Sequence, residues 1–216
     1  MKRTTMENNT MEQTITNETM IKREYIQRLI NTASKDKARK HLGCINVNQE
    51  KNRLESTNGH IALMVNCEYE LVWKGLIMPL LKIPAKITYV VFADSFQSSY
   101  LIDKNDNKYP FSAFFGLIDI GMRYPNFDRV MIQKDQLSVN FKSQQPIAFN
   151  FKLINDTIMN PAIKGYEEHI EFYFKDNLTE GYSQYQYLEP ILIVPCDNSK
   201  DVYERDWLAV AMPVRS

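Results

Sequence analysis

The most restrictive feature of the sequence is an Asn-Gly pair between two runs of strand-forming residues. Asn58 and Gly59 separate Arg53–Thr57 from Ile61–Val65. An Asn-Gly pair with such flanks is the strongest short-range signal for a β-hairpin, and it is typical of the type I′ turn. We therefore expect an antiparallel sheet that contains this hairpin.

The composition favours strands around a packed core. Hydrophobic residues make up 44% of the 216 residues and charged residues 24%, which excludes wholesale disorder. The chain has 12 Tyr and 11 Phe but only 7 Gly, a mixture that favours strands. Lys and Arg total 26, as do Asp and Glu, so the net charge is zero. Strong attraction of the whole molecule to nucleic acid is therefore not expected, while a local basic face remains open.

The cysteines and the apolar segments point to a cytoplasmic protein. Cys44, Cys67 and Cys196 are odd in number and widely spaced, and we interpret them as reduced, partly buried thiols. The first residues lack the basic-then-apolar pattern of a signal peptide. The longest apolar region, Gly75–Ala93, is interrupted by lysines and prolines, so no membrane span is expected.

The pattern along the chain predicts an α+β fold with mostly antiparallel sheets. Residues 1–17 are rich in Thr, Asn and Glu and are expected to form a disordered tail. Ile26, Leu29 and Ile30 recur at helical spacing, which predicts a helix over Thr19–Ala33 with Thr19 as its candidate cap.

Further elements follow the same alternation of strands with weak helices. A helical turn is expected over Leu80–Ile87, an ordered corner over Tyr124–Val130 and a short helix over Phe151–Met159. Strands are expected over Gly43–Val47, Ile87–Ala93, Ser98–Ile102, Phe111–Met122, Pro146–Asn150, His169–Phe174, Leu188–Val194 and Trp207–Met212. The order is that of a repeated β/α unit.

The sequence contains no recognisable catalytic or metal-binding motif. Asp103–Asn107 resembles a calcium loop but lacks the glycine and the glutamate that such a loop requires at its sixth and twelfth positions. His41, His60 and His169 have no metal-ligand spacing. We expect no enzyme activity, no metal and no cofactor.

Six short blocks follow one another along the chain: Ala38–Val47, Glu55–Leu63, Gly75–Pro79, Gly121–Val130, Ile147–Asp156 and Ala211–Arg215. Together they resemble, in order, blocks of the bacterial-type DNA polymerase sliding clamps. That family shows Ala-Thr-Asp-Gly-His-Arg-Leu-Ala where this chain has Glu55-Ser-Thr-Asn-Gly-His-Ile-Ala-Leu63, and it ends in Met-Pro-Met-Arg-Leu. The resemblance implies a DNA-clamp fold, with a complete clamp-like domain over 18–133 and a partial second one over 134–216. Asn58, Ile61 and Ser216 depart from the family pattern.

The resemblance also implies a function. The protein would be a processivity factor that encircles double-stranded DNA as a homo-oligomer and tethers a DNA polymerase or another replication protein, with a clamp loader as a further partner. The tether would be a peptide-binding groove, where Gly59 lets a second backbone approach closely and Met212 forms an adaptable apolar wall. The candidate groove residues are Thr57, Gly59, His60, Ile61, Ala62, Pro79, Ala211, Met212, Pro213, Val214 and Arg215.

A basic segment between residues 20 and 40 is the candidate DNA-binding surface. On the resemblance, it would contact phosphates without reading bases, so its binding would be sequence-independent and salt-dependent. The candidate residues are Lys22, Arg23, Arg28, Lys35, Lys37, Arg39 and Lys40. Plainer interpretations stay open: the hairpin as a turn without function, and the basic segment as a solvated helix face. An alternative function is a non-ring binding module that competes for clamp-binding peptides.

Overall fold

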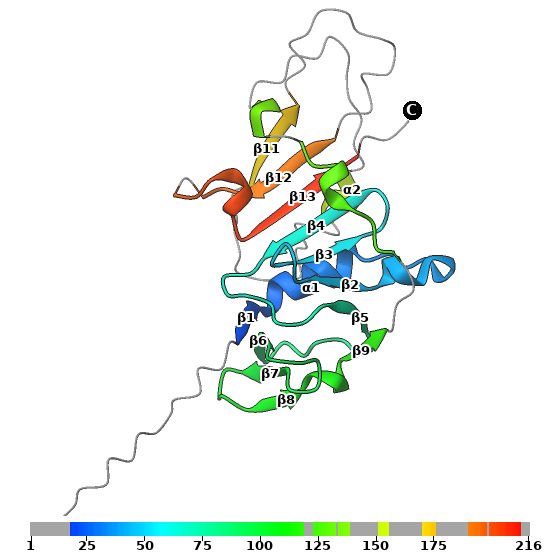
Figure 1. Ribbon diagram of the computed structural model, residues 1–216, viewed down its shortest axis with the longest axis vertical. Helices are drawn as coiled ribbons and strands as arrows, with labels where there is room; N and C mark the ends of the chain where they lie inside the picture. The colour runs from blue at the N-terminus through cyan, green and yellow to red at the C-terminus, as the bar shows by residue number, and fades with distance from the viewer. Residues whose placement is uncertain are drawn as a thin grey trace, which may run out of the picture.

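The computed structural model describes residues 18–118, 123–132, 134–138, 151–155, 170–175, 190–197 and 199–212. These residues form two antiparallel sheets, with α1 packed behind the larger one (Figure 1). The nine-stranded sheet has the order β10 (Leu137–Ser138), β11 (Ile170–Lys175), β12 (Ile191–Pro195), β13 (Trp207–Ala211), β4 (Ile61–Asn66), β3 (Arg53–Thr57), β2 (Ile45–Asn48), β5 (Gly75–Pro79) and β9 (Phe115–Ile118). The α+β class expected from the sequence is confirmed.

A smaller sheet and several short helices complete the described part of the chain. The four-stranded sheet has the order β1 (Thr19–Lys22), β6 (Ile87–Phe92), β7 (Tyr100–Asp103) and β8 (Lys108–Pro110). The α-helices are α1 (Arg23–Thr32) and α2 (Phe151–Ile154). The 3-10 helices are η1 (Lys37–Gly43), η2 (Phe111–Ala113), η3 (Phe127–Arg129), η4 (Lys134–Gln136) and η7 (Val202–Glu204).

The large sheet is covered on both faces at its centre. In β4, Ile61, Leu63 and Val65 belong to one apolar cluster and Ala62 and Met64 to another. Successive side chains of a strand point to opposite faces, so the two clusters lie on opposite sides of the sheet. We call the first side the helix face and the second the groove face. This double burial explains why β4 and β13 are nearly continuous apolar runs.

Each face has its own cover. On the helix face, Ile26 and Leu29 of α1 are fully buried in the same cluster as β4. On the groove face, Phe127 and Ile132 pack against the strands from the segment that follows residue 122. Both clusters also contain residues of β12 and β13, so each is built from both halves of the chain.

Strand β13 lies between β12 and β4 and joins the two halves of the sequence. Its register with β4 runs from Trp207 opposite Val65 to Ala211 opposite Ile61. One residue further on, the amide of Met212 donates to the carbonyl of His60 at 2.9 Å. The nine-stranded sheet thus contains strands from both of the clamp-like domains that the sequence predicts, 18–133 and 134–216. That division of the chain stays a prediction.

The amino-terminal part of the structure corrects one expectation. The helix begins at Arg23, and Thr19–Lys22 is strand β1, paired with β6. Thr19 does not cap the helix, because its hydroxyl donates to the carbonyl of Tyr69 at 2.9 Å. Thr19 and Ile21 are buried while Met20 is exposed, which is the alternation of a strand. The helical spacing itself was correct from Arg23 onward.

Two further expectations were wrong in part. Residues 80–86 form no helix, and Leu80 and Leu81 are exposed beside Pro84. The strand expected over Phe111–Met122 is instead η2 followed by β9, which ends at Ile118. The expected strand over 146–150 and the end of the helix beyond residue 155 lie outside the described residues, as does the amino-terminal tail.

All three cysteines are unpaired, as expected from the sequence. Cys44 and Cys67 are buried and unpaired, and Cys196 is exposed and unpaired. Burial raises the pKa of the Cys67 thiol to about 12, so this group stays protonated at neutral pH. Among the described residues, no helix is long and apolar enough to cross a membrane, and no group of side chains has a metal-binding arrangement.

Candidate functional site

The Asn-Gly hairpin is present, but its turn differs from the expected type I′. Gly59 has a φ of 92°, while Asn58 keeps a negative φ, and a type I′ turn needs positive values at both. Side chains close the turn instead. The Asn58 side-chain oxygen accepts from the amides of His60 and Ile61, and the Thr57 hydroxyl donates to the Ile61 carbonyl at 2.7 Å. Asparagine is therefore used here for its Asx-type hydrogen bonds.

A cavity of about 170 Å³ opens beside this turn, and we call it the hairpin groove. Three stretches that are far apart in the sequence meet there: the turn, the end of β13 and the corner around η3. Leu42 at the end of η1 closes the groove on one side. The lining residues are Leu42, Thr57, Gly59, His60, Ile61, Ala62, Pro125, Asn126, Phe127, Val130, Val210 and Met212.

The structure brings together six of the groove residues that the sequence singled out. Thr57, Gly59, His60, Ile61, Ala62 and Met212 all line the hairpin groove. Ala211 lies next to it but is buried within β13. Pro79 does not contribute, because it ends β5, which is separated from β4 by β2 and β3. Pro213, Val214 and Arg215 lie outside the described residues.

The remaining lining residues were missed from the sequence. Val210 could have been found by alternation, since it lies two positions before Met212 and shares its side of β13. The corner over Tyr124–Val130 was recognised as ordered, and both this corner and Leu42 lie in sequence blocks that resemble clamp motifs. Neither was assigned to the groove from the sequence, although the structure places both in its lining.

The corner that forms one wall of the groove is attached by polar contacts. The Tyr124 hydroxyl donates to the carbonyl of Cys44 at 3.3 Å, and burial raises the pKa of Tyr124, so the donor proton is retained. Arg53 of β3 reaches Asp128 at 3.1 Å, and Lys51 pairs with the same carboxylate at 3.2 Å. These contacts hold the corner, and with it Phe127, against the groove face.

Arg53 is itself held by a buried carboxylate. Glu55 is 2% exposed and accepts from Arg53 Nε at 2.7 Å. Its two oxygens also accept from the side-chain amides of Asn46 at 2.7 Å and Asn48 at 3.1 Å. Both oxygens of this buried carboxylate therefore have hydrogen-bond donors. The groove wall therefore depends on a chain of contacts that begins at Glu55.

One of the cations expected on a phosphate-binding face, Arg28, cannot take part in it. Arg28 is 3% exposed, with its guanidinium 4.9 Å from the ring of Trp207. The expectation that Arg28 contacts DNA is wrong, because a buried side chain cannot reach a phosphate. Arg23 Nε donates to the carbonyl of Pro84 at 3.1 Å, and Lys22 is half-buried at the end of β1. Contact of Arg23 and Lys22 with DNA stays a prediction.

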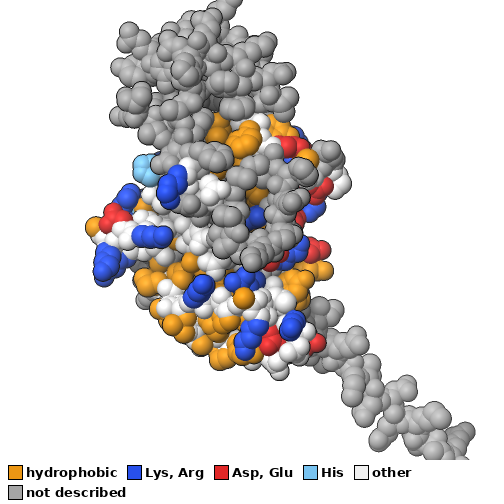
Figure 2. All heavy atoms as spheres, turned by 180° about the vertical axis from the view of Figure 1, so that it is seen from behind, with side chains coloured by type: hydrophobic (Ala, Val, Ile, Leu, Met, Phe, Trp, Pro, Cys, Tyr) orange, Lys and Arg blue, Asp and Glu red, His pale blue; other side chains and the backbone are white. Residues whose placement is uncertain are grey.

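The cations of the following connector lie elsewhere, beside the groove. Lys35, Lys37, Arg39 and Lys40 are all exposed. A Cβ atom built on Gly59 would lie 3.3 Å from Nη1 of Arg39, so this guanidinium extends across the hairpin turn. The light-blue segment at the right of Figure 1 carries these residues, and Lys and Arg side chains gather at the corresponding left edge of Figure 2.

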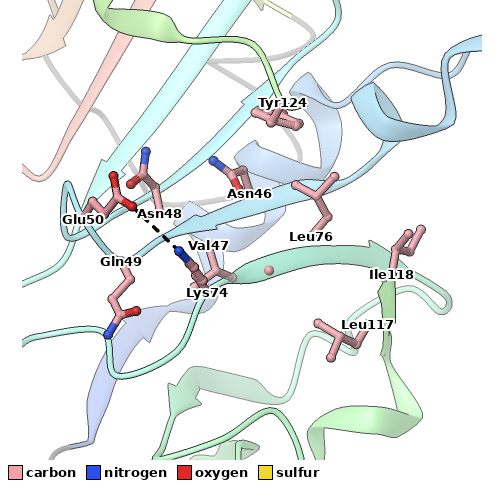
Figure 3. Close-up of a pocket in the computed structure, with 11 residues that line it drawn as sticks. Asn46, Val47, Asn48, Gln49, Glu50, Lys74, Leu76, Leu117, Ile118 and Tyr124 are labelled. Atoms are coloured by element: carbon pink, nitrogen blue, oxygen red, sulfur yellow. Dashed lines mark ion pairs between the residues drawn. The ribbon is translucent and has the colours of Figure 1, made fainter. Parts of the chain in front are cut away.

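A larger cavity, of about 570 Å³, lies at the β2, β5 and β9 edge of the nine-stranded sheet (Figure 3). It is lined by polar residues of β2 and the following turn, by Leu76, Leu117 and Ile118, and by an ion pair of Lys74 with Glu50 at 3.8 Å. None of the candidate groove or DNA-binding residues named from the sequence lines this cavity. The side-chain amides of Asn46 and Asn48 that line it already donate to Glu55, so we assign it no ligand.

Comparison of the structure with solved proteins finds bacterial sliding clamps. The beta chain of DNA polymerase III from Streptococcus pneumoniae TIGR4 is 14% identical with a TM-score of 0.48, over 93% of this chain and 65% of that one. A sliding clamp from Bartonella birtlesii bound to griselimycin is 16% identical with a TM-score of 0.44, over 92% and 66%. The sliding clamp from Bacillus subtilis is 12% identical with a TM-score of 0.43, over 92% and 64%.

This chain therefore spans about 65% of the length of the sliding clamps it matches. Their family is the one whose sequence blocks the chain resembles. No family model and no curated protein matches the sequence.

Proposed function

We propose that this protein is a sliding-clamp-like processivity factor that tethers a DNA polymerase or another replication protein to DNA in the cytoplasm. One observation carries the proposal: four sequence blocks that resemble clamp motifs line the same groove. These are the segment with Leu42, the hairpin around Gly59, the corner around Phe127 and the end of β13 at Met212. The groove would hold a short peptide of the partner, and the protein would perform no chemistry itself.

The groove suits a peptide with apolar anchors. Phe127 and Val210 form its buried apolar lining, and Met212 contributes a flexible thioether side chain at its rim. Burying one Leu or Phe side chain contributes about 1.5–3 kcal/mol. Two such anchors, after the cost of association, correspond to a dissociation constant of roughly micromolar size.

Replacing both His60 and Met212 with alanine is expected to weaken peptide binding by about five- to tenfold, because both side chains border the groove and neither is part of the core. The measurement is fluorescence anisotropy with labelled peptides of about nine residues that carry one Leu and one Phe at different spacings. Leu81→Ala is the matched control, since Leu81 is equally apolar and 59% exposed but does not line the groove.

Unchanged affinity in the double variant would remove these residues from the binding site. A loss of the same size in Leu81→Ala would mean that the peptides bind exposed apolar surface in general. If no peptide of the set binds the unchanged protein, the groove is not a peptide site and the proposal fails at this step.

Encirclement of DNA requires more than one chain, since this chain spans only part of the length of a clamp subunit. We expect light scattering to give a mass of at least twice 25.3 kDa for the full chain in solution. A strict monomer at every concentration, with and without circular DNA, would contradict the ring and leave the groove intact.

The second candidate function is a binding module that forms no ring and competes for clamp-binding peptides. One observation favours it: of the cations expected on the DNA-facing helix, Arg28 is buried and Arg23 donates to backbone carbonyls. Retention on circular DNA, lost when the circle is cut, would support the processivity factor. Peptide binding without such retention would support the module.

A further inference from the structure

We propose that the segment captured by the hairpin groove carries acidic residues beside its apolar anchors, and that Lys37, Arg39 and Lys40 bind them. We call these three residues the basic rim. This inference rests on the proposed function of the groove and adds the chemistry of its partner. The evidence is the position of the rim, its mostly uncompensated charge among the described residues, and the engagement of Arg23 and Arg28 of α1 in other contacts.

The basic rim lies at the mouth of the groove. Arg39 extends over Gly59 of the turn, and Leu42, two residues after Lys40, lines the groove. Two residues span at most about 7 Å of chain, so the backbone of Lys40 is within that distance of Leu42. Lys37 is equally close to Arg39. These distances are comparable to the screening length of about 8 Å at physiological salt.

The charge of the rim is mostly uncompensated. Asp36 is the single acid between residues 35 and 41, and it pairs with Arg39 at 2.9 Å. Within the described part of the chain, Lys37 and Lys40 form no ion pair. On the opposite wall Arg129 is exposed, while Asp128 is already paired with Lys51 and Arg53. A neutral protein thus concentrates positive charge around an apolar depression.

DNA is the other occupant that such charge could attract, and the structure favours it less. A phosphate-binding surface of this chain would need the cations of α1 and of the rim together. Arg28 is buried against Trp207 and Arg23 donates to two backbone carbonyls, so these two cations of α1 are less available to phosphates than the exposed rim. The rim instead adjoins the apolar lining at Leu42 and Gly59. Apolar lining with a charged border is the arrangement expected for an acidic peptide, because phosphates need no apolar lining.

The test compares three matched sets of synthetic peptides of about nine residues with the same Leu and Phe anchors. Their flanking positions carry Asp and Glu, Asn and Gln, or Lys. Binding to the full chain is measured by fluorescence anisotropy at about 50 mM and about 500 mM NaCl. We expect the acidic set to bind about fivefold more tightly than the amide set at low salt, since exposed ion pairs contribute modestly. At high salt the preference should fall below about twofold.

The variant Lys37→Glu/Lys40→Glu should abolish or reverse the preference and leave the amide set unchanged. Both side chains are exposed, so its thermal unfolding should match that of the unchanged protein. Lys82→Glu/Lys104→Glu is the control, because it makes the same charge change at exposed sites that do not line the groove.

Equal affinity for acidic and amide sets overturns this inference while the groove function stands. Failure of all sets to bind overturns both. A third result also overturns it: the rim variant loses affinity for a short duplex DNA in the same assay and keeps its preference among peptides.

Discussion

Trp207→Ala is expected to lower the free energy of unfolding by about 3–5 kcal/mol, the range for removing a large aromatic side chain from a core. Trp207 is fully buried on the helix face, at the start of β13 and opposite Val65 of β4. The guanidinium of Arg28 lies over the rings of both Trp207 and Tyr25, so the substitution would also remove one of the two aromatic contacts of a buried cation. Single domains are stable by only about 5–15 kcal/mol, so the loss is a large share of the total.

Urea unfolding followed by circular dichroism measures this loss, and peptide binding should weaken with it because β13 positions Met212 in the groove. Trp207→Phe is the matched control. Among the described residues the indole nitrogen of Trp207 has no hydrogen-bond partner. Trp207→Phe therefore reduces the side-chain volume in the core without removing a hydrogen bond. We expect it to cost less than half as much as alanine. Equal costs for the two variants would show that the lost packing is not the cause.

Glu55→Ala is expected to lower the free energy of unfolding by about 3–5 kcal/mol, the cost of removing one partner from a buried ion pair. Glu55 is 2% exposed and holds Arg53, Asn46 and Asn48 through three hydrogen bonds. Its removal leaves the Arg53 guanidinium, whose side chain is 13% exposed, paired only with Asp128. The corner with Phe127 would lose its alignment, so peptide binding in the groove should weaken as well.

The measurement is again urea unfolding, with Glu55→Gln as the matched variant. Glutamine keeps the shape and one acceptor oxygen but replaces the second acceptor by a donor, so we expect an intermediate loss. If Glu55→Ala lowers the free energy of unfolding by less than about 1 kcal/mol, the network contributes no more than an exposed ion pair does. Its role in holding the groove wall is then refuted.

Local sequence signals were sufficient for much of the fold. The strand over Arg53–Thr57 was predicted to the residue, and β4 extends only one residue beyond its expected end. The Asn-Gly turn signal lies between the two strands and β4 is a nearly continuous apolar run, so local and tertiary preferences agree. Strand β1 was missed because its four residues lead directly into a helix, and its alternation is too short to stand apart from the helical period.

The candidate site was predictable only where it consists of consecutive residues. The hairpin and Met212 were identified through motifs that each occupy a few positions. Leu42 and Phe127 reach the groove through long-range packing, which no local pattern encodes. Arg28 was misjudged for the same reason: a cation at helical spacing appears solvent-facing until Trp207, from the far end of the sequence, is placed over it.

The pairing of β13 with β4 determines when, during synthesis, the hairpin groove can form. Strand β4 pairs with β3 on one side, but its partner on the other side, β13, is synthesised more than 140 residues later. During synthesis, the hairpin therefore leaves the ribosome long before the wall that completes its groove. On the proposed function, a nascent chain cannot bind its partner until residues 207–212 have left the ribosome and joined the sheet. Long-range closure of this kind also slows folding relative to local contacts, so the groove is among the last parts to mature.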